Sequence, residues 1–146
     1  MRELFIDTNV LFDVLVESGE NGEFSEYARE LFDHADKHFI RLNICPLSYS
    51  NLYFLLRKLP FSHEDVLIDL WKISQKTKCL PVNETIIQQA LKSGFRDFED
   101  AIQNFCALQI PKCEAIITRD KKGFRSSILR IRTPEVFLSE ENLFNI

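Results

Sequence analysis

The sequence lacks an apolar run as long as the roughly 18 residues that a membrane-spanning helix needs, so no integral membrane protein is expected. Only four glycines and five prolines occur among 146 residues, which is too few for a flexible or collagen-like chain. Hydrophobic residues make up 45% and charged residues 27%, as in globular proteins and unlike disordered ones. No repeat or linker divides the chain, so we expect a single domain over residues 1–146.

A surplus of basic residues is also missing, since the formal net charge is −4 and the pI about 5.4. Contact with nucleic-acid phosphates would therefore be local or carried by bound cations. The first residues bring charge almost at once and lack the apolar stretch of a signal peptide, which favours a cytoplasmic location. The four cysteines form no C-x-x-C pair, so no disulfide framework is expected. The histidines His34 and His38 have no third ligand nearby, so a solvated helix end is expected there and not a metal site.

Short apolar segments alternate with helical patterns along the chain. Leu4-Phe5-Ile6 has no room for a helical period and predicts a buried strand that leads directly into a helix. Fully apolar strands alternating with helices are typical of a parallel sheet with helices on both faces. Further strands are predicted over residues 39–44, 79–82 and 115–118. Helices are predicted over residues 23–38, 46–59, 83–93 and 97–109, and another begins at residue 62. Residues 18–22 indicate a turn, and the tail after residue 128 indicates a short strand and a helical turn.

Acidic residues follow two of these strands and open one of the helices. Asp7 directly follows the first strand, and Asp120 comes two residues after the last long one. Asp97 and Asp100 lie three residues apart at a helix start, on one face of its first turn. Because the carboxyl ends of parallel strands meet at one edge of a sheet, we expect these four carboxylates to converge in one cleft.

Carboxylates that lie close together raise one another's pKa, and a hard divalent cation relieves their repulsion. Mg²⁺ and Mn²⁺ prefer oxygen ligands, and either ion can polarise a phosphodiester oxygen and activate the attacking water. A plainer interpretation stays open, because acids at a helix start favour the helix dipole and Asp120 suits a turn. Asp7 is the hardest to explain by structure alone, since an acid directly after a buried strand needs a partner.

Three segments match a known family in order and spacing: Ile6-Asp7-Thr8-Asn9-Val10-Leu11, Asp97-Phe98-Glu99-Asp100-Ala101-Ile102 and Ile117-Thr118-Arg119-Asp120-Lys121-Lys122-Gly123-Phe124. Together they resemble the signature blocks of PIN domains, especially the toxin-like ribonucleases of bacterial toxin–antitoxin pairs. The resemblance implies a three-layer α/β/α sandwich with a mostly parallel central sheet. It also implies endonucleolytic cleavage of RNA with Mg²⁺ or Mn²⁺, a small antitoxin protein as partner and, with the many phenylalanines, a homodimer.

The resemblance assigns the four acids to the metal, with catalysis as their role. Asp7 corresponds to the first ligand, Asp100 to the ligand on the helix and Asp97 to an accessory acid, while Asp120 falls within the last block. Thr8 and Asn9 correspond to the polar turn beside the metal, where short side chains orient a ligand or a metal-bound water. Thr118 is expected to act in the same way at the end of the last strand.

Two positions depart from the family pattern. Many members carry a glutamate in the helix after the second strand, where this chain has Asn51, an amide that can still coordinate weakly or bind a water. The last block often ends in Asp-Phe, and here Gly123 precedes Phe124. Fewer acids weaken the affinity for a cation, so a weak or inactive module that binds RNA or protein stays open as the alternative function.

Several basic residues lie near the expected cleft and are candidates to hold RNA phosphates, although a solvated turn and helix end would look the same. They are Arg119, Lys121, Lys122 and Arg125 after the last strand, with Arg57 and Lys58 at the end of the helix that carries Asn51.

Two other acidic site types fit less well. A phosphotransfer receiver domain needs an acid at the end of a middle strand, where this chain has Cys45-Pro46 and Pro81-Val82-Asn83. A phosphatase with an Asp-x-Asp pair needs a second acid where Asn9 stands.

Overall fold

The computed structural model describes residues 1–16 and 22–144, so the turn expected at residues 18–22 lies outside the described residues except for Gly22. A five-stranded sheet of order β3-β2-β1-β4-β5 forms its centre, and every strand pairing in it is parallel. The strands are β1 (Glu3–Ile6), β2 (Arg41–Ile44), β3 (Lys78–Cys79), β4 (Cys113–Ile117) and β5 (Ile131–Arg132). The helices are α1 (Thr8–Leu15), α2 (Gly22–Lys37), α3 (Leu47–Arg57), α4 (His63–Lys76), α5 (Glu84–Leu91), α6 (Phe98–Ala107), the 3₁₀ turn η1 (Lys121–Phe124) and α7 (Pro134–Phe144).

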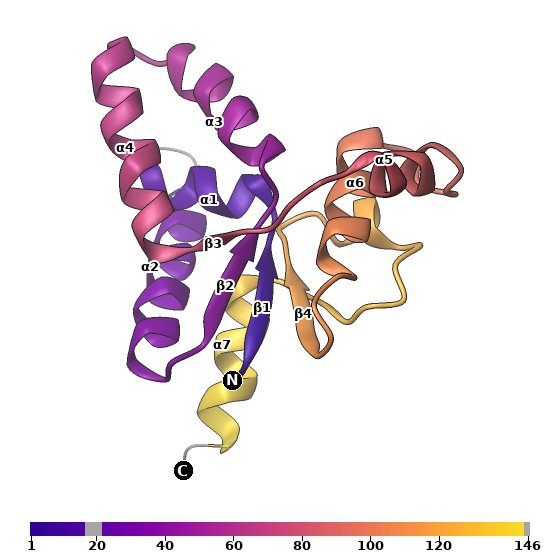
Figure 1. Cartoon of the computed structure of the whole chain (residues 1–146). Coiled ribbons are helices and arrows are strands. Elements are labelled where there is room, and N and C mark those ends of the chain that lie inside the picture. Colours follow the sequence, from indigo (N-terminus) through magenta and orange to yellow (C-terminus); the bar gives the residue numbers. More distant parts are fainter. Residues whose placement is uncertain (17–21, 145–146) are drawn as a thin grey trace.

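Helices cover both faces of the sheet, because side chains alternate along each strand. Leu4 and Ile6 pack with α1, α2, α3, α4 and α7, whereas Phe5 and Ile116 pack with α5, α6 and η1. Figure 1 shows the two groups of helices on either side of the strands. The expected three-layer α/β/α sandwich is confirmed. No helix in the described ranges combines the length and the apolar character needed to cross a membrane.

The predicted helix starts are confirmed by their caps. The side chains of Ser62, Asn83 and Asp97 each accept a hydrogen bond from the amide three residues further on, at 3.1, 3.0 and 2.9 Å. Each of these bonds satisfies one of the amides that a helix start leaves without a partner. Asp97 therefore has a local structural role in addition to the chemical one expected from the sequence.

The second strand is shorter than predicted, because residue 39 ends the preceding helix instead of opening the strand. Phe39 has φ of 56°, in the left-handed region, and its side chain is exposed. The amide of Ile40 then donates to the carbonyl of Ala35 at 2.9 Å, as in the usual left-handed helix ending. The tail contains a full helix, α7, where only a helical turn was expected, with Pro134 at its first position.

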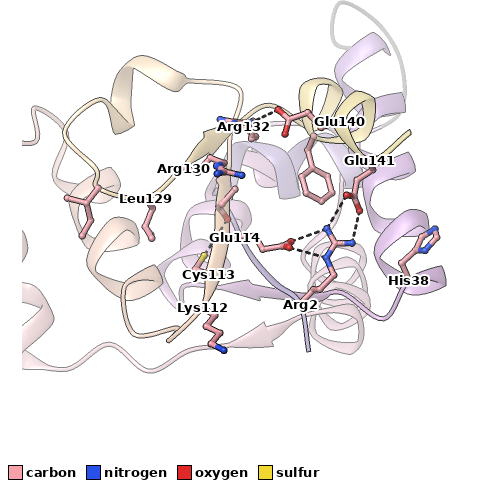
Figure 2. A pocket seen from close by; sticks show the side chains of 13 residues that line it. Arg2, His38, Lys112, Cys113, Glu114, Leu129, Arg130, Arg132, Glu140 and Glu141 are labelled. Carbon is pink, nitrogen blue, oxygen red and sulfur yellow. Dashed lines mark hydrogen bonds and ion pairs between the residues drawn. The ribbon is translucent and has the colours of Figure 1, made fainter. Parts of the chain in front are cut away.

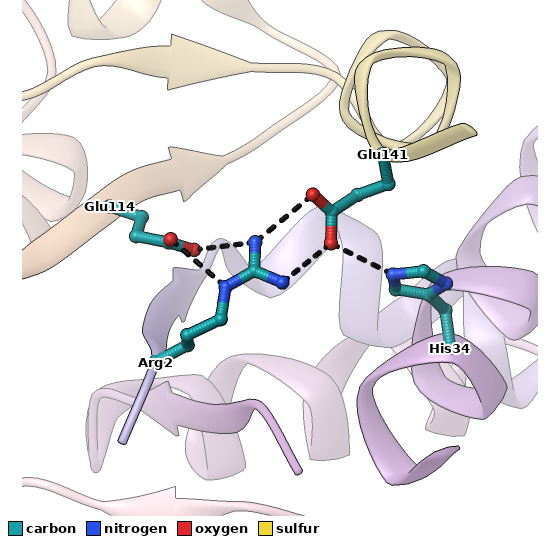
Figure 3. Close-up of polar contacts among 4 residues, drawn as sticks. All are labelled: Arg2, His34, Glu114 and Glu141. Atoms are coloured by element: carbon teal, nitrogen blue, oxygen red, sulfur yellow. Dashed lines mark hydrogen bonds and ion pairs between the residues drawn. The ribbon is translucent and has the colours of Figure 1, made fainter. Parts of the chain in front are cut away.

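Ion pairs at the amino ends of the strands tie the first and last segments together (Figure 3). Arg2 contacts Glu114 of β4 through Nε at 3.0 Å and Glu141 of α7 through Nη1 at 2.8 Å. Glu141 also lies 2.9 Å from Nε2 of His34 on α2. The sequence indicated a solvated helix end at His34, and this was wrong: its side chain is only 13% exposed, because α7 covers it.

We predict that Phe39→Gly stabilises the fold. Phe39 adopts a backbone conformation that costs an L-residue roughly 1–2 kcal/mol and costs glycine little. Glycine also loses more freedom on folding, which leaves an expected gain of about 0.5–1 kcal/mol in the free energy of unfolding by urea. Phe39→Ala is the control and should bring no such gain, because alanine retains the Cβ. An equal gain in both variants would mean that the stabilisation comes from removal of the exposed aromatic ring and not from the backbone conformation.

Candidate functional site

Asp7 lies where β1 ends and α1 begins, and its carboxylate is held on both sides. The residue is 3% exposed. Its Oδ1 accepts a hydrogen bond from Nε2 of Gln103 on α6 at 2.8 Å, and its Oδ2 accepts one from Oγ1 of Thr118 at 2.7 Å. The Asp7 amide donates to the carbonyl of Ile117 at 3.0 Å, so the parallel pairing of β1 with β4 fixes the position of the Asp7 backbone at the edge of the sheet.

Burial raises the pKa of Asp7 above its ordinary value, because a carboxylate away from water is harder to ionise. The hydrogen bonds from Thr118 and Gln103 act against this shift, and the nearby charge of Glu99 adds to it. The orientation of Gln103 is itself fixed, since its Oε1 accepts the amide of Thr8 at 3.2 Å and leaves the NH₂ group for Asp7. A cation close by would favour the charged carboxylate that this arrangement orients.

Thr118 connects Asp7 to the acid that follows β4. Its Oγ1, which donates to Asp7, also accepts the amide of Asp120 at 3.0 Å. Asp120 in turn accepts the amide of Gly123 at 3.2 Å and so caps η1. Thr118 thus bonds both Asp7 and the backbone of Asp120, two of the predicted acids.

Gly123 allows the acids of two segments to come together. A Cβ atom at this position would lie within 3.0 Å of both Oδ2 of Asp100 and Oδ2 of Asp120. The two oxygens are therefore separated by no more than twice that distance, across the space that glycine leaves open. An aspartate at this position, which the family pattern often has, would collide with Asp100 unless the acid moved.

Asp100, in the first turn of α6, is where the acids act on one another most strongly. Its pKa is raised to about 7, first by burial and then by the charges of Asp7, Asp97, Asp120 and Glu99. Gln103 lies three residues further along the same face of α6 and touches Asp7, so Asp7 is close enough for its charge to act on Asp100. The four expected acids thus come to the same edge of the sheet.

The donor set suits a hard divalent ion, because carboxylate oxygens of Asp100 and Asp120 meet around Gly123, and burial together with the charges of the neighbouring acids raises the pKa of Asp100. In residues 1–16 and 22–144, no three His, Cys, Asp or Glu side chains are arranged as a ready-made metal site. An ion at this edge would therefore complete its shell with waters, as Mg²⁺ commonly does.

A cleft of about 510 Å³ opens at the acids. Asp97, Asp100 and Asp120 line it, and so do Lys122 and Arg125 of the predicted basic set. Asp7, which was expected in the same cleft, does not line it, because its side chain is buried. Arg96, which the sequence analysis did not single out, lines it as well. Positive side chains thus lie beside the acidic edge, within reach of a phosphate that the acids alone would repel.

The other predicted basic residues are placed differently. Arg119 forms an ion pair with the buried Asp13, so its charge is already paired. Arg57 donates to the carbonyl of Phe61 at 2.9 Å at the far end of α3, which leads away from the sheet in Figure 1. Lys58 follows it and, like Lys121 on η1, is exposed.

The polar residues beside the acids make contacts that the sequence did not specify. Oγ1 of Thr8 lies 2.7 Å from Oγ of the buried Ser48 and donates to Glu99 at 3.1 Å. The side chain of Asn9 is exposed, and that of Asn51 is partly buried one turn after Ser48 on α3. Neither amide side chain makes a hydrogen bond within the described part of the chain.

Sequence reasoning missed Gln103, Ser48 and Glu99. A signal was present for Gln103, because it lies three residues after Asp100 and must share its helix face. Ser48 precedes Asn51 by the same spacing, so it shares the face where the family often has an acid. Glu99 was set aside as a helix-start acid, although its carboxylate bonds Thr8 and lies close enough to Asp7 and Asp100 to raise both pKa values.

A larger hollow, about 1030 Å³, lies at the opposite ends of the strands. Arg2, Lys112 and Arg130 line it, and they precede β1, β4 and β5 respectively (Figure 2). Many of its charges pair with one another, as Arg2 does with Glu114 and Glu141. Size alone therefore does not make this hollow the functional site.

Comparison with known proteins gives one family and a shared fold. The model of the family described as PIN domain matches residues 3–122. The structure of FitAB bound to the IR36 DNA fragment is 16% identical, with a TM-score of 0.62, and the match covers 90% of this chain and 94% of that one. The crystal structure of PAE2754 from Pyrobaculum aerophilum is 17% identical, with a TM-score of 0.63 and coverage of 97% and 96%. No curated protein matches the chain.

We predict that Asp100→Asn makes the metal-free protein more stable at pH 8. The pKa of about 7 in the folded state lies above the ordinary value of 3.8, so the folded state binds the proton more tightly and wild-type stability falls as pH rises between these values. Removing the charge should raise the free energy of unfolding by about 1–2 kcal/mol after allowance for solvent screening. Urea titrations in EDTA at pH 8 and pH 5 should show the gain shrinking at the lower pH.

The control for this prediction is Asp36→Asn, which removes one exposed acid from α2. It should change stability little at either pH. If Asp100→Asn were less stable than the wild type at pH 8, the statement that like charges around Asp100 destabilise the metal-free protein would be wrong.

We also predict that Gly123→Ala turns the Asp100 carboxylate away from Asp120. The new methyl group would meet both oxygens, and the flexible side-chain end is the part able to move. The pKa of Asp100, followed by carboxyl ¹³C NMR, should then fall by roughly one unit towards its ordinary value. Gly94→Ala is the matched control, because a Cβ there has nothing within 4 Å; an unchanged pKa in Gly123→Ala would mean that the carboxylates are not held against this glycine.

Proposed function

The chain belongs to the PIN domain family, and on that premise we propose that it is an endoribonuclease that hydrolyses RNA phosphodiester bonds with Mg²⁺ or Mn²⁺. PIN domains are generally nucleases and generally use divalent metal ions. The observation that carries the proposal is the crowding at Asp100, whose pKa of about 7 reflects burial beside the charges of four other acids. That arrangement disfavours the empty, fully ionised state and favours a bound cation.

In this proposal Asp7, Asp100 and Asp120 hold the ion, with Asp97 as the accessory acid. Thr118 and Gln103 keep Asp7 in one orientation, as donors behind a metal-ligating carboxylate do. When bound, the ion supplies Lewis-acid polarisation of the phosphate and lowers the pKa of a water.

The basic side chains of the cleft supply the substrate contacts in this proposal. Arg96, Lys122 and Arg125 line the same cleft as the acids and would hold the phosphates on either side of the scissile bond. Lys121 would add to this field from the exposed side of η1. Contacts to phosphate position a strand without reading its sequence, so these residues favour affinity over selectivity.

The partners that we propose are a small antitoxin protein and a second copy of the chain, in line with the resemblance to toxin-like ribonucleases. One structure with the same fold is FitAB bound to a DNA fragment, so this fold occurs in a complex with nucleic acid. Leu67, Ile68 and Trp71 support a protein-covered surface, because they are 48%, 54% and 67% exposed on one side of α4.

We predict that the purified protein cleaves single-stranded RNA with Mg²⁺ or Mn²⁺ and that EDTA stops the reaction. Asp7→Asn and Asp100→Asn should each lower kcat by about 10²-fold or more, because each removes a charge that holds the ion. Cleavage of a fluorescent RNA measures this, with Asp36→Asn as the active control.

Undiminished cleavage in both aspartate variants would overturn the assignment of these ligands. RNA binding in a gel-shift assay without turnover in any divalent ion would favour the alternative, a module that only binds.

A further inference from the structure

One buried carboxylate lies outside the acidic edge and has no role in the function proposed above. Asp13, on α1, is 1% exposed, and its Oδ2 lies 2.7 Å from Nε of Arg119. Its Oδ1 and Nε of Arg119 are both buried without a hydrogen bond within residues 1–16 and 22–144, so the contact is an ion pair without a well-aligned hydrogen bond. Such a pair contributes little to stability, because burying charges with unsatisfied polar atoms costs about as much as the attraction returns.

Arg119, the partner of Asp13, lies between the two residues that connect β4 to the acidic edge. Thr118 before it donates to Asp7, and Asp120 after it lies beside Asp100. The guanidinium of Arg119 lies 4.8 Å from the centre of the Phe24 ring on α2, so its side chain is held between α1 and α2.

The Arg119 side chain anchors the bend that follows β4. Ile117, the last residue of β4, packs with α1 and α2, and Arg119 is held between the same two helices by Asp13 and Phe24. On either side of Arg119, Thr118 bonds Asp7 and Asp120 lies beside Asp100. The ion pair with Asp13 therefore fixes one side chain of the bend from which Thr118 and Asp120 reach the acidic edge.

We propose that Asp13 is a positioning residue which, through Arg119, keeps Asp120 facing Asp100. The proposal rests on the function proposed above, because it concerns the same acidic edge. It also assigns Arg119 to the support of this loop instead of to RNA phosphates.

The test measures Mn²⁺ affinity by calorimetry and the hydrogen exchange of the Asp120 amide by NMR, both starting from metal-free protein. Asp13→Asn keeps the shape of the side chain and removes its charge. We expect Mn²⁺ to bind about tenfold more weakly, as when a group behind a metal ligand is changed. The Asp120 amide, which donates to Thr118, should exchange about tenfold faster without metal because its anchor loosens.

The matched control is Glu140→Gln, which removes the charge from the ion pair between Glu140 and Nε of Arg132 at 2.6 Å. It should leave the Mn²⁺ affinity and the exchange of the Asp120 amide unchanged. A second variant, Asp13→Leu with Arg119→Met, replaces the pair by apolar side chains and should retain the fold while showing both losses.

Unchanged Mn²⁺ affinity and unchanged exchange in a folded Asp13 variant would overturn the proposal. Failure of the wild type to bind Mn²⁺ would instead contradict the proposed function, and the exchange of the Asp120 amide would still decide the role of Asp13. Kinetics separate the two roles of Arg119: Arg119→Met should lower kcat and leave KM unchanged, whereas loss of a phosphate contact would raise KM.

Discussion

Like charges held close together at one edge of the sheet are the constraint that shapes this protein. Asp100 is surrounded by the charges of Asp7, Asp97, Asp120 and Glu99, and burial raises its pKa further. No arrangement of carboxylates alone relieves this repulsion, so the surrounding structure must hold the acids in place against it. The caps, the hydrogen bonds to Asp7 and the missing side chain of Gly123 all contribute to this.

Local signals in the sequence predicted much of the fold, because they act over a few residues. The apolar run before Asp7 and the capping residues Ser62, Asn83 and Asp97 depend on strand alternation and on the nearest amides alone. Phe39 shows the limit of this reasoning. Its β-forming side chain indicated a strand, yet the end of α2 requires a left-handed residue at that position, and tertiary packing overrides the propensity.

Partners between segments could not be predicted in the same way. Gln103 faces Asp7 only because α6 packs against the sheet at a particular position along the strands. The spacing of residues within one segment does not determine that position. Gly123 is the clearest case. In the sequence it counts as an acid lost from the family pattern, whereas in the structure it is the space into which the Asp100 and Asp120 carboxylates project. A missing side chain thus brings two others together, which a comparison of residue types does not show.

Burial is the largest cause of the raised pKa at both Asp7 and Asp100, but their other contacts differ in how a cation would act on them. Asp7 already has neutral donors on each oxygen, so its geometry is fixed before any ion arrives. Asp100 lies among like charges, so an ion would remove the repulsion that opposes its ionisation. Binding would therefore cost little reorganisation at Asp7 and relieve repulsion at Asp100. A ligand that binds only the folded state adds to the stability of that state. The crowding of charge that destabilises the metal-free protein therefore also makes its stability depend more strongly on the bound ion.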